Sequence, residues 1–498
     1  MELRWHGYRY FPYERALALR EVKSLLRPTR IVAGDNSIRI AGRILPEAVR
    51  KLVYFAEAQA NERSFVTLQG QLERVNGNGP NRQSTRYSVH GLHEYKGKFN
   101  PQTARAILNI LGVKQSNRIL DPFCGSGTTL VECAHLGFNA VGADVNPMAI
   151  YIANAKLKAL KSRASSVRMA LERVLARVET IRDTTLLKRK RDARADYLRK
   201  WFDSEVLRDI ERLRSAICAR GAEHSEILLC VASNLLREYS LQDPNDLRIR
   251  RRQSPLPSTP FYEAFERASQ IFIERLADAQ SVLGIASRTA TVARLIDARV
   301  LTRAVSGADG PFDCAITSPP YATALPYIDT QRLSLVWLGL VPPARILTLE
   351  ASLVGSREAR GAERSRLKES MLGNAHKLPK EQAVYCLTLS NALGAGDGFR
   401  RQAVPGLLYR YFVDMKRSFG AIRKCMRKDA PYALIVGGNH TVLGGRRFDI
   451  GTASHLISLA RSEGWVHQET IALQTYQRYG YHMGNAISSE SLVILRAR

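Results

Sequence analysis

A glycine-containing turn is the clearest ligand-binding candidate in this 498-residue sequence. It reads Asp121-Pro-Phe-Cys-Gly-Ser-Gly-Thr-Thr-Leu130 and lies between a predicted strand and a predicted helix. Gly125 and Gly127 permit a tight turn and let the backbone approach a ligand closely. The N-terminus of the following helix favours a negatively charged group such as a carboxylate. Leu130 stands where a dinucleotide-binding turn has its third glycine, and no Lys-Ser or Lys-Thr pair follows, so neither that turn nor a P-loop is indicated.

Two acidic residues follow strands of the same predicted sheet. Asp144 ends the strand at 139–143, and Asp297 ends the strand at 291–296. An acidic side chain in the first position can accept hydrogen bonds from both hydroxyls of a ribose. Asp297 is placed to accept a hydrogen bond from an adenine amino group. Because open α/β sheets bind ligands at the carboxyl ends of their strands, we expect both residues near the glycine turn.

These residues need a sheet whose strands end at one edge, and the sequence predicts one. Helix, strand, helix and strand follow one another at 104–111, 118–120, 128–136 and 139–143, a pattern typical of parallel sheets covered by helices. After a long helical stretch, strands resume at 291–296 and at 314–317. The C-terminal part alternates again, with strands at 432–436, 466–473 and 491–495 and helices at 409–426 and 452–463. The total is about seven strands.

The same pattern divides the chain into four parts. The first is an N-terminal α/β extension without an assigned role, with a helix expected over 14–26 and a strand over 37–40. The second and fourth are two parts of one core, and the third is a basic, mostly helical insertion that is far longer than a connection at that place needs. The expected boundaries are 1–80, 85–156, 157–288 and 289–498.

Three motifs resemble the S-adenosylmethionine-dependent DNA amino-methyltransferases, which methylate cytosine N4 or adenine N6. They are the glycine turn, Gly-Ala-Asp144-Val-Asn146-Pro and Ser318-Pro-Pro-Tyr321. A further segment, His93-Glu-Tyr-Lys-Gly-Lys-Phe-Asn-Pro101, resembles the one that closes over the methionine end of the cofactor in that family. The resemblance covers roughly 85–155 and 290–335 well, the C-terminal strands loosely and residues 1–80 not at all.

The resemblance implies a fold, a cofactor and a set of site residues. The fold is α/β, a class I methyltransferase with a Rossmann-like, mostly parallel seven-stranded sheet and here a large helical insertion. The cofactor is S-adenosyl-L-methionine, and no metal ion is required. The residues implied to bind the cofactor are Lys98, Phe99, Asp121, Phe123, Gly125, Gly127, Thr128, Asp144, Asn146 and Asp297. The residues implied to carry the chemistry are Ser318, Pro319, Pro320 and Tyr321.

The Ser318–Tyr321 loop has the groups that an exocyclic amine of a nucleobase needs. Two prolines fix φ and remove two backbone donors, so the loop offers carbonyl oxygens without competing N–H groups. The Ser318 side chain and the Pro319 carbonyl can accept the amine hydrogens, while Tyr321 offers an aromatic face for stacking. A base inside a duplex cannot reach such a loop, so the target base must be flipped out.

Several reactions remain to be distinguished. Methylation of a ring carbon needs a thiolate beside proline, and the chain has no Pro-Cys pair. In the resembling family, serine before Pro-Pro-Tyr favours cytosine N4, so we expect cytosine-N4 methylation of a specific DNA sequence. Adenine-N6 methylation of DNA, guanine-N2 methylation of tRNA and a non-catalytic DNA-binding subunit stay open as alternatives. His90 and His93 lack carboxylate and cysteine partners in the sequence and are interpreted as non-ligands.

The charge balance favours a polyanionic partner. Lys plus Arg number 74 against 46 Asp plus Glu, a net charge of +28. We expect double-stranded DNA as the partner, and a cognate restriction endonuclease is a further candidate. Phosphate contacts are expected in the insertion, from Arg182, Lys188 to Arg191, Arg194 and Arg248 to Arg252. A second candidate recognition region is 336–405, which carries Arg357, Arg360, Arg364, Arg366, Arg400 and Arg401.

Cysteine usage and hydropathy bear on the compartment. Seven cysteines occur without a CxxC pair, which fits a reducing environment. The first 20 residues carry charges throughout, and no run of about 18 apolar residues occurs anywhere. We therefore expect a cytoplasmic, nucleoid-associated protein without membrane contact.

Overall fold

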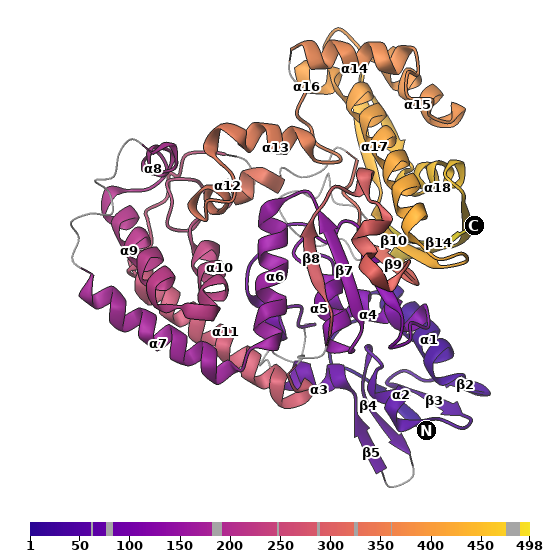
Figure 1. Ribbon diagram of the computed structural model, residues 1–498. Helices are drawn as coiled ribbons and strands as arrows, with labels where there is room; N and C mark the ends of the chain where they lie inside the picture. The colour runs from indigo at the N-terminus through magenta and orange to yellow at the C-terminus, as the bar shows by residue number, and fades with distance from the viewer. Residues whose placement is uncertain are drawn as a thin grey trace.

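A seven-stranded sheet forms the centre of the computed structural model, which describes residues 1–60, 63–75, 83–181, 192–246, 249–285, 289–322, 327–359, 361–474 and 489–498. The strand order is β13-β14-β10-β9-β6-β7-β8 (Figure 1). The strands are β6 (Arg118–Asp121), β7 (Asn139–Asp144), β8 (Val292–Leu295), β9 (Cys314–Thr317), β10 (Pro431–Gly437), β13 (Trp465–Gln474) and β14 (Ser489–Ala497).

One strand of this sheet runs against the others. β6 pairs in parallel with β7 and β9, β7 with β8, and β9 with β10, whereas β14 is antiparallel to both of its neighbours, β10 and β13. The residues that begin β14 therefore lie at the edge where the parallel strands end. This order, with a single reversed strand next to the sheet's end, confirms the predicted class I methyltransferase fold.

The two faces of the sheet bury two separate apolar clusters. Successive side chains of a strand point to opposite faces, so Ile119 and Leu120 of β6 belong to different clusters. On the Ile119 side the sheet is covered by α4 (Pro101–Ile110), α5 (Thr128–His135) and α6 (Pro147–Lys161). On the Leu120 side it is covered by α17 (Val404–Cys425) and α18 (Thr452–Ser462). Both faces of the central sheet are thus covered by helices and shielded from water, as is usual for parallel strands.

Most of the core elements were predictable. The strands predicted at 118–120, 139–143, 291–296, 314–317, 432–436, 466–473 and 491–495 are confirmed within a few residues, as are the helices around 104–111, 128–136, 409–426 and 452–463. The hairpin of β11 (Asn439–Leu443) and β12 (Arg446–Ile450) was missed. α6 continues to Lys161, past the expected start of the insertion, because it packs on β8 as a core crossover helix.

The N-terminal module, residues 1–75, contains a second sheet. Its order is β2-β3-β1-β4-β5 and all pairs are antiparallel. Of the elements of this module, the sequence predicts only the strand at 37–40 and the helix at 14–26. The elements are β1 (Glu2–Trp5), α1 (Pro12–Leu26), β2 (Arg30–Ala33), β3 (Ser37–Ala41), α2 (Pro46–Arg50), β4 (Phe55–Ala60), β5 (Arg63–Val66) and α3 (Leu68–Val75).

The helix α1 joins this module to the central sheet. It packs against α4 and β13. Its buried Glu21 accepts hydrogen bonds from the Val53 amide (3.1 Å) and from Asn109 Nδ2 of α4 (2.7 Å). Arg20 donates two hydrogen bonds to the Glu469 carboxylate of β13, at 2.9 and 2.6 Å. The module is therefore attached to the core by hydrogen bonds and an ion pair as well as by apolar packing.

Two helical regions extend from the core (Figure 1). The insertion, on the left of the view, contains α7 (Ala164–Thr180), α8 (Ala193–Arg199), α9 (Ser204–Arg220), α10 (Ser225–Leu235) and α11 (Phe261–Leu283), and α7 packs on α9 and α11. The second region contains α14 (Ala362–Leu372), α15 (Lys380–Asn391) and α16 (Phe399–Gln402), which pack on α17, whereas α12 (Tyr327–Trp337) and α13 (Ile346–Ser352) lie beside the insertion.

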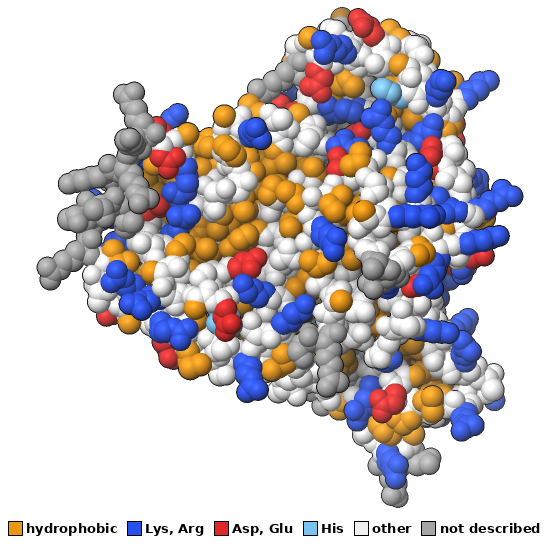
Figure 2. Space-filling model, viewed as in Figure 1, with side chains coloured by type: hydrophobic (Ala, Val, Ile, Leu, Met, Phe, Trp, Pro, Cys, Tyr) orange, Lys and Arg blue, Asp and Glu red, His pale blue; other side chains and the backbone are white. Residues whose placement is uncertain are grey.

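The surface is uneven in character. Figure 2 shows Lys and Arg side chains concentrated at the right edge, beside α17 and α18, and hydrophobic side chains gathered in the upper middle, over α12 and α13. Within the described residues, no helix is both long and apolar enough to span a bilayer.

Candidate functional site

A pocket, here the first chamber, opens at the carboxyl ends of four parallel strands. Phe123 and Gly125 line it after β6, and Asp144 and Asn146 line it where β7 ends. Asp297 follows β8, and Ser318 and Pro320 follow β9; Tyr95 and Gly97 close it from the loop before α4. The motifs that lie far apart in the sequence therefore meet at one sheet edge, as ligand sites of open α/β sheets do.

The two glycines of the turn have different tasks. Gly125 has φ +48° and lines the first chamber, and a Cβ there would lie 3.3 Å from the Tyr95 ring. The bare backbone thus keeps room for a ligand between the turn and Tyr95. Gly127 has φ +79° and does not line the chamber; a Cβ there would lie 2.8 Å from the Cβ of Ala153. Gly127 is therefore needed for packing of α5 on α6.

Asp144 holds the glycine turn while it faces the chamber. One carboxylate oxygen accepts from the Gly125 amide at 3.0 Å and the other accepts from the Asn146 amide at 2.9 Å. Each oxygen keeps a further lone-pair site, so ribose hydroxyls can still donate to it. Burial raises the pKa of Asp144 to about 6. Asn146 itself caps α6 through Met148 N and donates to Gln331.

The raised pKa predicts a pH-dependent affinity for the cofactor or its demethylated product. Below about pH 6, Asp144 takes up a proton and loses acceptor capacity, so binding should weaken as the pH falls. We expect S-adenosylhomocysteine to bind about tenfold more weakly at pH 5 than at pH 8, measured by calorimetry. In Asp144→Asn the affinity should be low at both pH values. An Asp144→Asn protein with an unchanged pH dependence would contradict this assignment.

Asp121 and Thr128 lie behind the chamber. Asp121 is buried and accepts hydrogen bonds from Thr317 Oγ1 (2.7 Å) and from the Phe123 amide (3.3 Å). Burial raises its pKa to about 6. Thr128 is the first residue of α5 and is also buried. Asp121 thus connects the glycine turn to the end of β9, immediately before Ser318.

Asp297 lies in the chamber and belongs to a charge cluster. Arg299 donates to it at 2.6 Å and also contacts Asp414 of α17 at 3.1 Å. Burial alone would raise the pKa of Asp297, but the hydrogen bonds from Arg299 keep it below its usual value. Asp297 therefore remains an ionised acceptor.

Lys98 and Phe99 line a different pocket, here the second chamber. Lys98 Nζ donates to the carbonyl oxygens of Thr85 (2.8 Å) and His90 (3.3 Å), which closes the loop between them. Burial, with the nearby cations Lys156 and Arg86, lowers the pKa of Lys98 to about 6. Two neighbours of Lys98 in its motif do line the first chamber, Tyr95 and Gly97.

The catalytic-loop candidates lie where the two chambers meet. Ser318 and Gly97 line both chambers, Pro319 and Tyr321 line the second, and Pro320 lines the first. Ser318 Oγ lies 3.4 Å from the carbonyl oxygen of Ile435 in β10 and donates to it. The Ser318 oxygen thereby keeps its lone pairs for a donor in the chamber.

Among the residues of the second chamber that sequence reasoning missed, two come from distant parts of the chain. Tyr13 enters it from α1 of the N-terminal module, and Glu490 enters it from the start of β14. The Tyr321 hydroxyl donates to Glu490 Oε1 at 2.6 Å. Neither residue stands in a motif, and only the packing of α1 and the reversal of β14 bring them here.

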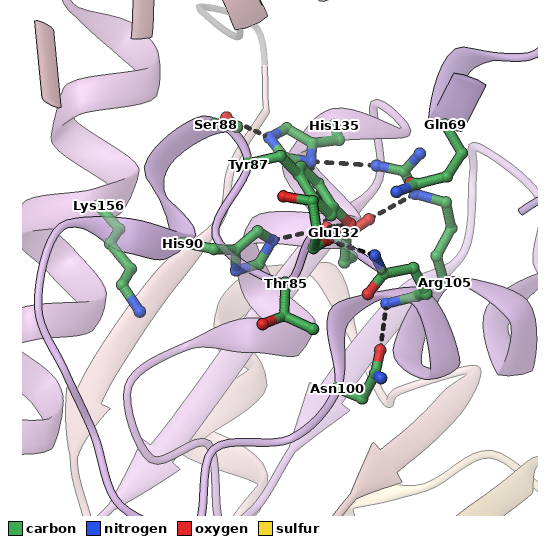
Figure 3. A network of polar contacts seen from close by, with 12 residues as sticks. Gln69, Thr85, Tyr87, Ser88, His90, Asn100, Arg105, Glu132, His135 and Lys156 are labelled. Carbon is green, nitrogen blue, oxygen red and sulfur yellow. Dashed lines mark hydrogen bonds and ion pairs between the residues drawn. The ribbon is translucent and has the colours of Figure 1, made fainter. Parts of the chain in front are cut away.

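A buried polar network anchors the loop that closes both chambers (Figure 3). Glu132 of α5 accepts from Arg105 Nε at 2.5 Å and from the Tyr87 hydroxyl at 2.8 Å, and it contacts His90 Nε2 at 2.7 Å. Although burial alone would raise the pKa of Glu132, Arg105 and the histidines hold it well below its usual value. His90, interpreted from sequence as lacking a carboxylate partner, therefore has one.

The same network includes three side chains of metal-ligating type. His90, Glu132 and His135 bring their ligand atoms within 4.8 Å of one another. The Arg105 guanidinium already neutralises the carboxylate and also lies 3.3 Å from His135 Nδ1. A divalent cation there would be repelled by a fixed positive charge, so we interpret the cluster as structural.

Three of the arginines proposed to contact phosphates, Arg194, Arg251 and Arg252, have partners within the protein. Arg194 donates to Glu211 at 2.8 Å and to the carbonyl oxygen of Trp337, which ties α8 to α9 and to the end of α12. Arg251 lies over the Trp201 ring, and Arg252 donates to backbone carbonyls. These contacts orient the side chains, and the expected role of these arginines as phosphate contacts stays a prediction. Arg182, the run 188–191 and Arg248 lie outside the described residues.

Comparison with known proteins points to methyltransferases of DNA and of RNA. Residues 92–186 match the model of the family described as "UPF0020: RMKL-like, methyltransferase domain". The chain is 23% identical over 395 residues to Type II methyltransferase M.MvaI of Kocuria varians, covering 72% of this chain and 78% of that protein. Type II methyltransferase M.MjaII of Methanocaldococcus jannaschii is 47% identical over 70 residues, 14% of this chain and 13% of that protein.

An RNA methyltransferase gives a match of similar strength. The tRNA (guanine(10)-N2)-dimethyltransferase of Methanothermobacter thermautotrophicus is 48% identical over 52 residues, 10% of this chain and 16% of that protein. The chain thus spans less than a fifth of the length of two of these relatives and about three quarters of the third. The fold and the matched methyltransferase domain imply S-adenosyl-L-methionine as the cofactor, and the first chamber has the groups to hold it.

Proposed function

We propose that this protein methylates an exocyclic amine of a flipped-out base in a specific DNA sequence, with cytosine N4 as the target atom. The observation that carries the proposal is the meeting of the two chambers at Ser318 and Gly97. The bound cofactor supplies a sulfonium methyl group, whose S–C bond breaks as the N–C bond forms, leaving a neutral thioether and releasing one amine proton. The protein's task is to align the two reactants.

The loop residues divide this task. Ser318 Oγ and the Pro319 carbonyl accept the amine hydrogens, which orients the nitrogen lone pair toward the first chamber. Tyr321 presents its ring to the base in the second chamber, as bases out of the stack require. Asp144 and Asp297 hold the ribose and the adenine amine of the cofactor. Asp121, through its hydrogen bond from Thr317, fixes the position of the Ser318–Tyr321 loop relative to the glycine turn.

Similarity and charge support DNA as the substrate. The relative that this chain matches over most of its length is named a Type II methyltransferase. The net charge of +28 favours a polyanion, and exposed cations such as Arg366 and Arg400 remain in the region 336–405. Arg364 in the same region packs on the Phe399 ring, and Arg401 contacts Asp397.

The test is methyl transfer from labelled cofactor to duplex DNA and to tRNA in parallel, followed by nucleoside mass spectrometry. We expect N4-methylcytosine in the DNA and no label in the tRNA. Methyladenine in the DNA would identify adenine, in place of cytosine, as the target base. Label on a guanine amine of the tRNA would favour the activity named for the tRNA (guanine(10)-N2)-dimethyltransferase, which this chain matches over 52 residues. Cofactor binding without transfer to either would indicate a non-catalytic subunit.

A further inference from the structure

A carboxylate stands opposite the reactive loop in the second chamber. Glu490, the second residue of β14, lines this chamber together with Tyr321. The two side chains are joined by the 2.6 Å hydrogen bond from the tyrosine hydroxyl. They are 169 residues apart in the sequence, and no motif includes Glu490.

The reversed strand explains how Glu490 reaches this edge. In the sheet register Glu490 pairs with Gly437, the last residue of β10, and with Leu473, next to the end of β13. Because β14 runs opposite to its neighbours, its first residues lie where the others finish. An acidic residue at the start of β14 therefore faces the loop that leaves β9, one strand beyond β10.

The contact has the geometry of a strong hydrogen bond. Hydroxyl-to-carboxylate hydrogen bonds of about 2.5–2.7 Å are charge-assisted and roughly twice as strong as neutral ones. Both side chains are half-buried, so water competes less for them than on an open surface. The tyrosine backbone is held separately, since a Cβ at Gly355 would lie 2.7 Å from the Tyr321 carbonyl oxygen. Packing thus fixes the main chain of Tyr321, and Glu490 fixes the ring.

We propose that Glu490 is a positioning residue, which holds the Tyr321 ring in the orientation that stacks the flipped-out base and brings its amine to Ser318. The inference rests on the proposed function. A carboxylate only accepts hydrogen bonds, so the tyrosine hydroxyl is committed as a donor toward β14. The ring face, rather than the hydroxyl, is then the surface offered to the base.

The test combines four variants with one control. Glu490→Ala removes the acceptor, Glu490→Gln keeps an acceptor oxygen without the charge, and Tyr321→Phe removes the donor but keeps the ring. The fourth is the double variant Tyr321→Phe/Glu490→Ala. Gln474→Ala, at an exposed position on the adjacent strand, is the matched control.

Two readouts separate positioning from general damage. The first is the NMR signal of the Tyr321 Cζ in protein labelled at tyrosine, assigned by its loss in Tyr321→Phe. It should shift in Glu490→Ala and stay in place in Gln474→Ala. The second is the single-turnover rate of methyl transfer, which should fall about 10- to 100-fold in Glu490→Ala and in Tyr321→Phe, with unchanged affinity for S-adenosylhomocysteine.

The double variant decides the mechanism. If the two groups act as one unit, the double variant should be no slower than either single variant, and Glu490→Gln should stay within about threefold of the wild type. Two results would overturn the inference while leaving the proposed function intact. One is a double variant whose loss of rate equals the product of the two single losses. The other is a Tyr321 signal that does not move in Glu490→Ala. A wild-type protein that methylates no nucleic acid would overturn the proposed function, and the role of Glu490 with it.

Discussion

Replacing Ser318 with alanine should slow methyl transfer by about two to three orders of magnitude, because the transition state loses an oxygen that orients the reacting amine. Ser318 is the polar side chain that both chambers share, and its hydroxyl hydrogen is committed to Ile435. The single-turnover rate with saturating cofactor measures the effect. Affinity for S-adenosylhomocysteine, measured by calorimetry, should change by less than about threefold, since the lost oxygen faces the amine.

A control separates this effect from a general loss of structure. Ser281→Ala, at an exposed position on α11 where the hydroxyl bonds only within its own helix, should retain the wild-type rate. A Ser318→Ala protein that retains the wild-type rate would remove the serine from the chemistry. It would leave the Pro319 carbonyl as the acceptor to be tested.

Replacing Glu132 with alanine should cost about 3–5 kcal/mol of folding free energy. The substitution leaves Arg105, whose side chain is fully buried, without its carboxylate, and it deprives the Tyr87 hydroxyl of an acceptor. Denaturant unfolding followed by circular dichroism measures the shift of the midpoint. Because the network anchors the 85–100 loop, the variant should also bind S-adenosylhomocysteine more weakly than the wild type.

This cost arises because the buried Arg105 charge is left without a counter-charge. A variant that removes both charges tests this explanation. Arg105→Met/Glu132→Leu removes both charges at once and should recover much of the lost stability. Glu226→Ala, which breaks a partly exposed contact with Lys158, should cost less than about 1 kcal/mol. A double variant less stable than Glu132→Ala alone would contradict the electrostatic explanation.

The cofactor side of the site was predictable because it follows strand ends. Asp144, Asp297 and the glycine turn each lie at or within two residues of the end of a short strand, and local patterns mark such positions in the sequence. The structure brings them to one chamber. It also separates roles that the motif does not distinguish, since Gly127 and Asp121 support the turn from behind while Gly125 faces the ligand.

The remaining parts depend on long-range packing, which a sequence pattern does not encode. Glu490 lies at the site because one strand is reversed, and Tyr13 because α1 packs against α4 and β13. The arginines of the insertion are predicted phosphate contacts, but composition does not show that Arg194 and Arg251 also meet partners from other elements. Apart from the strand at 37–40, the antiparallel sheet of residues 1–75 was missed; its edge strands β2 and β5 contain no fully buried residue and so lack the apolar pattern of a core strand.

The paired contacts between Arg20 and Glu469 have a consequence for biosynthesis. The two residues are separated by 449 positions. A ribosome that adds about 5–20 residues per second therefore incorporates Glu469 roughly 20–90 s after Arg20. During that interval the apolar side of α1 that later covers β13 has no permanent partner on the nascent chain. Chaperone binding to the emerging polypeptide should therefore be concentrated on its first thirty or so residues and end when β13 has left the exit tunnel.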